Sequence, residues 1–134
     1  MSNVFQDIHE MHKKYGVHKW ICEQAGKGEW SLLEKFMQFR LAFLREELNE
    51  TTKAVNEKDE KEIVDGLIDL IVVAVGTLDA FEVDGEKAWK EVLKANMAKE
   101  VGVKESRPNP LGMPDLIKPD GWKGPDHSGN TGLL

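Results

Sequence analysis

Apolar residues recur at helical spacing in four segments of the chain, and no convincing strand pattern interrupts them. In the first segment Phe5, Ile8 and Tyr15 share one face with His12, and Gly16 ends the pattern. The four predicted helices span about residues 3–15, 31–56, 59–80 and 84–101. The pattern therefore predicts an all-α fold, a four-helix bundle in which the second and third helices form an antiparallel central pair.

Two of these helices begin with a recognisable capping sequence. Ser31 is followed three residues later by Glu34, and Asp59 stands in the same relation to Glu62. The linker 16–30 has no assignable conformation. The later part of the third helix, "LIVVAVG", is apolar on nearly every side, which predicts burial at a subunit interface and hence a homodimer or homotetramer.

The chain changes character at residue 104, so we predict a helical domain over 1–103 and an irregular C-terminal tail over 104–134. All five prolines lie in this tail, which cannot hold a regular helix. We expect an extended segment laid over the body or a partner subunit, anchored by Trp122 and Lys118, with a disordered end.

Acidic residues continue the apolar stripes of the two central helices. Glu47 and Glu50 fall inside the core-directed face of the second helix, and Glu46 lies on its border. On the third helix Glu62 and Asp65 begin the stripe that Asp69, Val73 and Gly76 continue. Acids on a helix usually face water, but two clusters on core-directed stripes indicate a site.

An antiparallel hairpin that turns near Asn56 would place Glu50 level with Glu62 and Glu47 level with Asp65. One close pair of like charges costs about 4 kcal/mol at an effective dielectric of 20. The carboxylates must therefore take up protons or bind a divalent cation. Oxygen ligands suit Mg²⁺, with Mn²⁺ as a second possibility, and no His or Cys lies nearby to favour zinc.

Other polar and aromatic residues leave alternatives open. Asp69 either caps the acidic cluster or pairs with Arg40 or Lys99, and Arg40 either neutralises an acid or contacts a phosphate. Trp30 is a candidate for stacking on a base, although aromatic residues are more often part of a core. His9 and His12 form H-x-x-H without the glutamates of known metal motifs, so we assign them to the surface or the core.

Composition narrows the possible partners and compartment. The 134 residues carry a net charge of −6 and no basic patch, which excludes a typical nucleic-acid binder. The single Cys22 excludes an internal disulfide and indicates a reducing compartment. The chain shows neither a secretory signal at its start nor an apolar run long enough for a membrane span, so we expect a cytoplasmic protein.

The motifs "EELNE", Glu46 to Glu50, and "EIVD", Glu62 to Asp65, resemble the E-E-x-x-E and E-x-x-D pattern of the all-α nucleoside triphosphate pyrophosphohydrolases. These include the MazG-like proteins, the dimeric dUTPases and phosphoribosyl-ATP pyrophosphohydrolase. The segments "DGLIDLIVVAVGTLDAFEVD" and "AWKEVLKANMAKE" are similar to the MazG-like branch. The resemblance spans about Phe5 to Lys99.

The resemblance implies Mg²⁺ ligation by Glu47, Glu50, Glu62 and Asp65, with Asp69 as an alternative to Asp65. Catalysis would rest on Glu46 and Glu47, with Glu46 as a further ligand or as the base that activates water. The resemblance also implies substrate contacts by Asn96 and Lys99, although Lys99 is equally an ordinary cation near a helix C-terminus. Arg40 and Trp30 are further substrate-binding candidates from the sequence pattern alone.

The reaction implied by the resemblance is hydrolysis of a nucleoside triphosphate to the monophosphate and pyrophosphate. Phosphoribosyl-ATP is an alternative substrate within the same family. A helical scaffold whose acids bind a basic partner is the alternative without catalysis. A stand-alone MazG-like enzyme fits the tail better, because "KPDGW" is similar to tails of bacterial and phage members.

Overall fold

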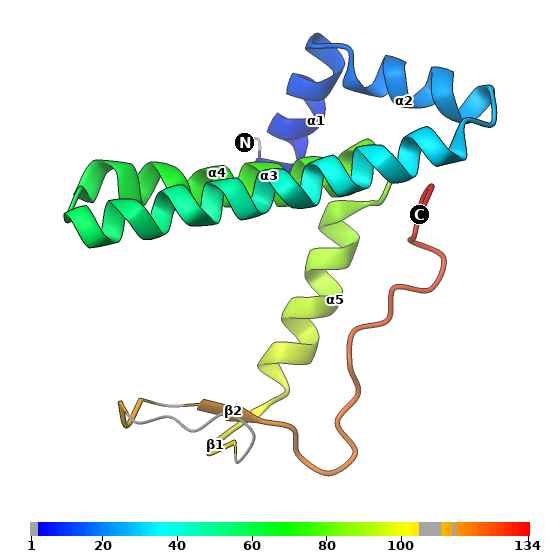
Figure 1. The fold of residues 1–134 in the computed structure, drawn as a ribbon. Helices are drawn as coiled ribbons and strands as arrows, with labels where there is room; N and C mark the ends of the chain where they lie inside the picture. Colours follow the sequence, from blue (N-terminus) through cyan, green and yellow to red (C-terminus); the bar gives the residue numbers. More distant parts are fainter. Residues whose placement is uncertain (1–2, 105–110, 114) are drawn as a thin grey trace. The chain divides into compact units, whose positions relative to one another are not determined.

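The computed structural model describes residues 3–104, 111–113 and 115–134 (Figure 1). The described residues are mostly helical, as predicted, with one small antiparallel sheet in addition. The elements are α1 (Val4–Lys14), α2 (Val17–Gly26), α3 (Trp30–Glu57), α4 (Glu60–Ala80), α5 (Gly85–Met97), β1 (Glu100–Gly102) and β2 (Asp115–Ile117). None of these helices has the length and apolarity needed to cross a membrane.

Helix α2 occupies the segment to which no conformation could be assigned. Its apolar residues Val17, Trp20, Ile21 and Ala25 are spaced as on one helical face. Ile21 is completely buried in a core cluster with Leu33, Ala80 and Phe81, and the other three pack against that cluster. Trp20 is therefore a core residue, and its ring centroid lies 5.5 Å from that of Phe36.

Helix α3 begins and ends within one residue of the predicted bounds, but the structure of its two ends differs from the prediction. Glu29 occupies the N-cap position without a side-chain hydrogen bond, so the capping box predicted at Ser31 is wrong. At the other end Lys58 adopts the left-handed conformation with φ of 56°. Its N–H donates to Val55 O and that of Asp59 donates to Ala54 O, which is the Schellman arrangement. The helix therefore continues beyond Asn56.

Helix α4 begins immediately after this turn. The Asp59 carboxylate accepts a hydrogen bond from the Glu62 N–H at 3.2 Å, which confirms the predicted N-terminal cap. Helices α3 and α4 lie side by side and antiparallel (Figure 1), as the sequence predicts for the central pair. The hairpin is a tight connection, and its centre lies at Lys58 and Asp59.

The chain forms two compact units. One unit contains residues 1–85 with 131–134, and the other contains 86–130. In the second unit α5 ends at Met97, and residues 100–102 form β1, so the helix predicted to reach Val101 is too long. Strand β1 pairs with β2, with Val101 opposite Leu116. These strands correct the expectation of a chain without strands.

The C-terminal end is docked rather than disordered. The Leu133 N–H donates a hydrogen bond to Phe81 O at 2.8 Å, and the Leu133 side chain packs on the core cluster. Gly132 makes this approach possible, because a Cβ at this position would collide with the Phe81 and Glu82 backbone. The last residues therefore complete the core next to α4.

Candidate active site

The acidic side chains lie on the paired helices α3 and α4, and one close contact fixes their register. Gly66 of α4 packs directly against Thr51 of α3, since a Cβ built on Gly66 would lie 3.1 Å from Thr51 Cβ. Four residues further from the turn on each helix, Glu47 is level with Leu70 and adjacent to Asp69. The predicted level pairing of Glu47 with Asp65 is wrong, because the hairpin turns at Lys58 instead of Asn56.

Two carboxyl groups of the cluster, those of Glu47 and Asp69, have pKa values raised by desolvation and by neighbouring acids. Partial desolvation raises the pKa of the Glu47 carboxyl, and the charge of Asp69 raises it further, followed by those of Glu50, Glu46 and Asp65. Desolvation also raises the pKa of Asp69, and both the charge of Asp65 and side-chain hydrogen bonding with Asp65 raise it further. The charges of four acids, from both helices, therefore act on the Glu47 carboxyl.

The cluster is more open to solvent than the sequence predicts. Glu47 and Asp69 are partly buried, whereas Glu46, Glu50 and Asp65 are exposed. Glu62 is also exposed, close to the turn, and it is not among the groups that raise the pKa of Glu47. The helical stripe is nevertheless correct, because Gly66, Val73 and Gly76 on the same side of α4 are buried. The acidic part of that stripe remains accessible to a ligand.

Arg40 is held between the two helices. Its Nε donates to Thr77 Oγ1 at 3.0 Å and its Nη2 donates to Val73 O at 3.1 Å. Burial lowers the pKa of the guanidinium, which lies over the rings of Phe36 and Phe43. The predicted pairing of Asp69 with Arg40 does not form, and Arg40 instead joins α3 to α4. A phosphate contact by Arg40 stays a prediction.

Trp30 lies far from the acids within one chain. It is the first residue of α3, 17 residues before Glu47, which corresponds to about 25 Å of helix. Its side chain is 53% exposed and lines a hollow with Phe81 and Leu133. Trp30 therefore cannot stack on a base whose phosphates sit directly at Glu47 of the same chain.

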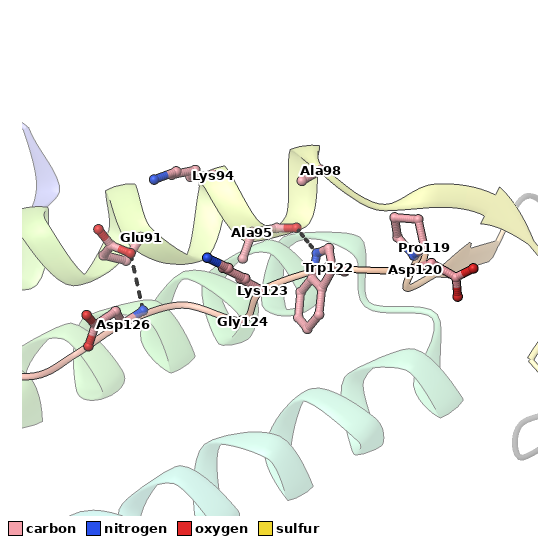
Figure 2. Close-up of a pocket in the computed structure, with 11 residues that line it drawn as sticks. Glu91, Lys94, Ala95, Ala98, Pro119, Asp120, Trp122, Lys123, Gly124 and Asp126 are labelled. Carbon is pink, nitrogen blue, oxygen red and sulfur yellow. Dashed lines mark hydrogen bonds between the residues drawn. The ribbon is translucent and has the colours of Figure 1, made fainter.

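Asn96 and Lys99 belong to the second compact unit, at the C-terminal end of α5. Lys99 Nζ lies 5.5 Å from the centroid of the Trp122 ring, and Lys118 Nζ lies 4.9 Å from the same ring. Figure 2 shows the Trp122 indole donating a hydrogen bond to Ala95 O, at 2.8 Å. Trp122 thus anchors the tail to α5, as predicted. Substrate contacts of Asn96 and Lys99 stay predictions.

A second polar cluster, which the sequence did not reveal, surrounds Asp79 of α4. His9 and His12 of α1 and His18 of α2 all place a ring nitrogen within 2.9 Å of its carboxylate. The H-x-x-H spacing of α1 was visible in the sequence, but the third histidine and the aspartate come from distant positions. Only the packing of α1 and α2 against α4 brings them together.

The acids on α3 and α4 have the chemistry of a site for a hard divalent cation. They offer oxygen ligands and they are accessible. Two of them have raised pKa values, and the positive charge of a cation would lower these pKa values again. Their carboxylate oxygens do not form a group of three that all lie within 4.8 Å of one another. Among the described residues, only His9, His18 and Asp79 form a group of that kind.

Comparison with known proteins places this helical pair in a known family. A family model described as phosphoribosyl-ATP pyrophosphohydrolase matches residues 17–96, which is more than half of the chain and includes α2, α3, α4 and most of α5. No curated protein and no solved structure matches the chain significantly. The matched region contains every acid discussed above, whereas α1 and the tail lie outside it.

Proposed function

Because the chain belongs to the phosphoribosyl-ATP pyrophosphohydrolase family, we propose that it hydrolyses a nucleotide triphosphate between its α- and β-phosphates and releases pyrophosphate. The family supports a nucleotide pyrophosphohydrolase that acts on a phosphoanhydride bond. The observation that carries the proposal is the group of mutually interacting carboxyls on α3 and α4, inside the matched region.

We assign the cation ligands to Glu47, Glu50, Asp65 and Asp69, with Glu62 as a further ligand nearer the turn. Asp69 replaces Asp65 as the partner closest to Glu47, since its charge has the largest Coulomb effect on the Glu47 carboxyl. Bound Mg²⁺ would neutralise phosphate oxygens and lower the pKa of a coordinated water. The open face of the hairpin leaves room for a triphosphate on the solvent side.

A carboxylate of this cluster also serves as the general base. Glu46 is exposed beside Glu47 and is not needed to hold the two helices together, so it is free to accept the proton of the attacking water. The water oxygen forms a bond to the α-phosphorus while the bond to the bridging oxygen breaks. The monophosphate leaves with the new oxygen, and pyrophosphate leaves with the bridging oxygen.

The decisive experiment is a product assay with phosphoribosyl-ATP and the common ribo- and deoxyribonucleoside triphosphates in ¹⁸O-labelled water. We expect pyrophosphate release in the presence of Mg²⁺ and none after chelation, with ¹⁸O recovered in the monophosphate. Label recovered in pyrophosphate, or release of orthophosphate, would contradict attack at the α-phosphorus. A folded protein inactive on every triphosphate would favour the scaffold alternative.

We also propose that the protein is a homo-oligomer assembled through one face of α4. Val64, Leu67, Ile68 and Ile71 follow the spacing of a single helical stripe and are 64%, 51%, 53% and 47% exposed. This stripe lies opposite the face that packs on α3, and a monomer rarely exposes so continuous an apolar surface. A second copy of the chain, which carries the same stripe, would cover it.

An Ile68→Lys variant is expected to shift the protein toward the monomer in sedimentation velocity, because the charge would have to be buried at the interface. Gln38→Lys provides the matched control, since it adds the same charge at an exposed polar position of α3. Wild-type protein that sediments as a monomer at all concentrations, or equal effects of both substitutions, would refute the assembly.

A further inference from the structure

A cluster of imidazoles and one carboxylate lies outside the proposed active site. His9 comes from α1, His18 from α2 and Asp79 from the last turns of α4. One possible ligand atom from each of these residues lies within 4.8 Å of the other two, and no other group of this kind occurs among the described residues. All three residues belong to the same compact unit.

The distances within this cluster are short on both sides of the aspartate. His9 Nδ1 lies 2.8 Å from Asp79 Oδ1, and His18 Nε2 lies 2.9 Å from Asp79 Oδ2. The rings of His9 and His18 are neighbours, with centroids 4.6 Å apart and a tilt of 55°. Two imidazole nitrogens and a carboxylate therefore converge on one point from three helices.

One ring nitrogen of this cluster has no hydrogen-bond partner among the described residues. His18 Nε2 is buried and close to Asp79, yet its direction does not give a hydrogen bond to any partner in the described residues. A buried polar nitrogen without a hydrogen-bond partner destabilises the folded state. An ion placed between the three residues would accept the lone pair of this nitrogen.

His12 supports the cluster without being needed as a ligand. Its Nδ1 lies 2.9 Å from Asp79 Oδ2, and it is buried. The His12 ring nitrogen and the Asp79 carboxylate share a hydrogen bond. Such an outer hydrogen bond fixes the orientation of a ligating carboxylate.

We propose that His9 Nδ1, His18 Nε2 and a carboxylate oxygen of Asp79 bind a Zn²⁺ ion, separate from the oxygen-rich cation site on α3 and α4. Two neutral imidazoles and one carboxylate form a common set of protein ligands for zinc. At bond lengths of about 2.0–2.1 Å, tetrahedral ligand atoms stand about 3.3 Å apart. The two nitrogen–oxygen distances, 2.8 and 2.9 Å, lie within about 0.5 Å of this value, and all the ligand atoms lie within 4.8 Å of one another.

The exposure of the histidines fits access of the ion from solvent. The His9 side chain is 50% exposed, whereas that of His18 is 20% exposed and that of Asp79 is 15% exposed. A water molecule could take the fourth position on the side of His9. The ion would join α1 and α2 to α4 and so would stabilise the folded chain instead of acting on the substrate.

The test is zinc binding by the full-length protein in a buffer with excess Mg²⁺, which occupies the oxygen ligands on α3 and α4. We expect one Zn²⁺ per chain by metal analysis after dialysis, and a higher melting temperature than in the metal-free protein. Long-range ¹⁵N NMR spectra of the imidazoles are expected to shift at His9 Nδ1 and His18 Nε2. These readouts do not depend on catalytic activity.

The controls separate this site from other zinc ligands. His9→Gln, at a half-exposed position, is expected to fold normally and to weaken zinc binding at least about 10-fold, by loss of one ligand. His127→Gln, at a histidine outside the cluster, is expected to bind zinc like the wild type. Glu47→Gln is expected to do the same. Zinc binding that is absent, or equally strong in His9→Gln, would overturn the proposal.

Discussion

Replacing Glu47 by Gln is expected to reduce pyrophosphate release at least about 100-fold, because a cation ligand at the centre of the acidic cluster is lost. Glu47 is the carboxyl whose pKa responds to all four neighbouring acids, so its position is the electrostatic centre of the group. The substitution keeps the size of the side chain and removes its charge. The measurement is kcat for each substrate at saturating Mg²⁺.

The same substitution is expected to raise the stability of the metal-free protein at neutral pH. The pKa of Glu47 is raised in the folded state, so between its ordinary and its raised value the folded state holds more protons than the unfolded state. Stability of the wild type therefore falls as pH rises through this window. Gln does not titrate, so the gain in melting temperature should disappear at pH values below the ordinary carboxyl range.

Addition of Mg²⁺ should reverse the order of the two proteins. The cation stabilises the folded wild type by binding to it alone, and it should have much less effect on Glu47→Gln. Glu57→Gln is the matched control, because Glu57 is an exposed glutamate at the end of the same helix, 3.9 Å from Lys53. A wild-type kcat in Glu47→Gln would contradict a catalytic role of the acidic cluster.

The face of each central helix could be predicted from the sequence because helical periodicity is a local property. Buried Leu33, Thr51 and Ala54 lie on the side of α3 that the apolar pattern predicts, and Gly66 and Val73 do so on α4. The acids follow these stripes, so their presence on neighbouring surfaces could also be predicted. Helix α2 carried the same signal in a short segment between glycines, where the pattern covers barely two turns.

The register between the helices could not be predicted, because it depends on where the first helix ends. The residue that ends the helix in the left-handed conformation is usually a glycine, but here it is Lys58. The sequence therefore gives no local signal for the position of the turn. The difference of about two residues at the turn moves the partner of Glu47 by four to five residues, from Asp65 to the level of Asp69. Sequence periodicity alone contains no information on this shift.

Contacts between distant segments were also beyond the sequence pattern. Asp79 lies 70 residues from His9, and no local sequence pattern connects the two positions. The docking of Leu133 on Phe81 is another example, because a short polar segment with glycines resembles a disordered end. Such contacts depend on which helices pack together, and the helix propensity of each segment does not determine its packing partner.

The second large effect is expected for Gly66→Ala, which should destabilise the protein by about 1–3 kcal/mol through overpacking between α3 and α4. A Cβ at Gly66 would overlap Thr51 Oγ1 and would lie 3.1 Å from Thr51 Cβ. Thr51 Oγ1 cannot move freely, since it donates a hydrogen bond to Glu47 O at 2.7 Å. Urea denaturation monitored by circular dichroism measures the change.

A double-mutant cycle identifies the cause of this destabilisation. Thr51→Ala removes the hydroxyl that a Cβ at Gly66 would overlap. The loss of unfolding free energy in the double variant Thr51→Ala, Gly66→Ala should therefore be smaller than the sum of the two single losses, by about 0.5–3 kcal/mol. Gly26→Ala is the control, because a Cβ on this glycine of α2 meets no atom within 4 Å. It should be neutral or slightly stabilising, since alanine restricts the unfolded chain.

The spacing of α3 and α4 at this contact also sets the separation of the carboxyls one turn away. Gly66→Ala should therefore lower pyrophosphate release even at temperatures where the variant is fully folded, whereas Gly26→Ala should not. Thr51→Ala in the double variant should restore part of this activity along with stability. Unchanged stability and activity in Gly66→Ala would mean that the helices do not approach this closely, and the register that brings Glu47 beside Asp69 would be wrong.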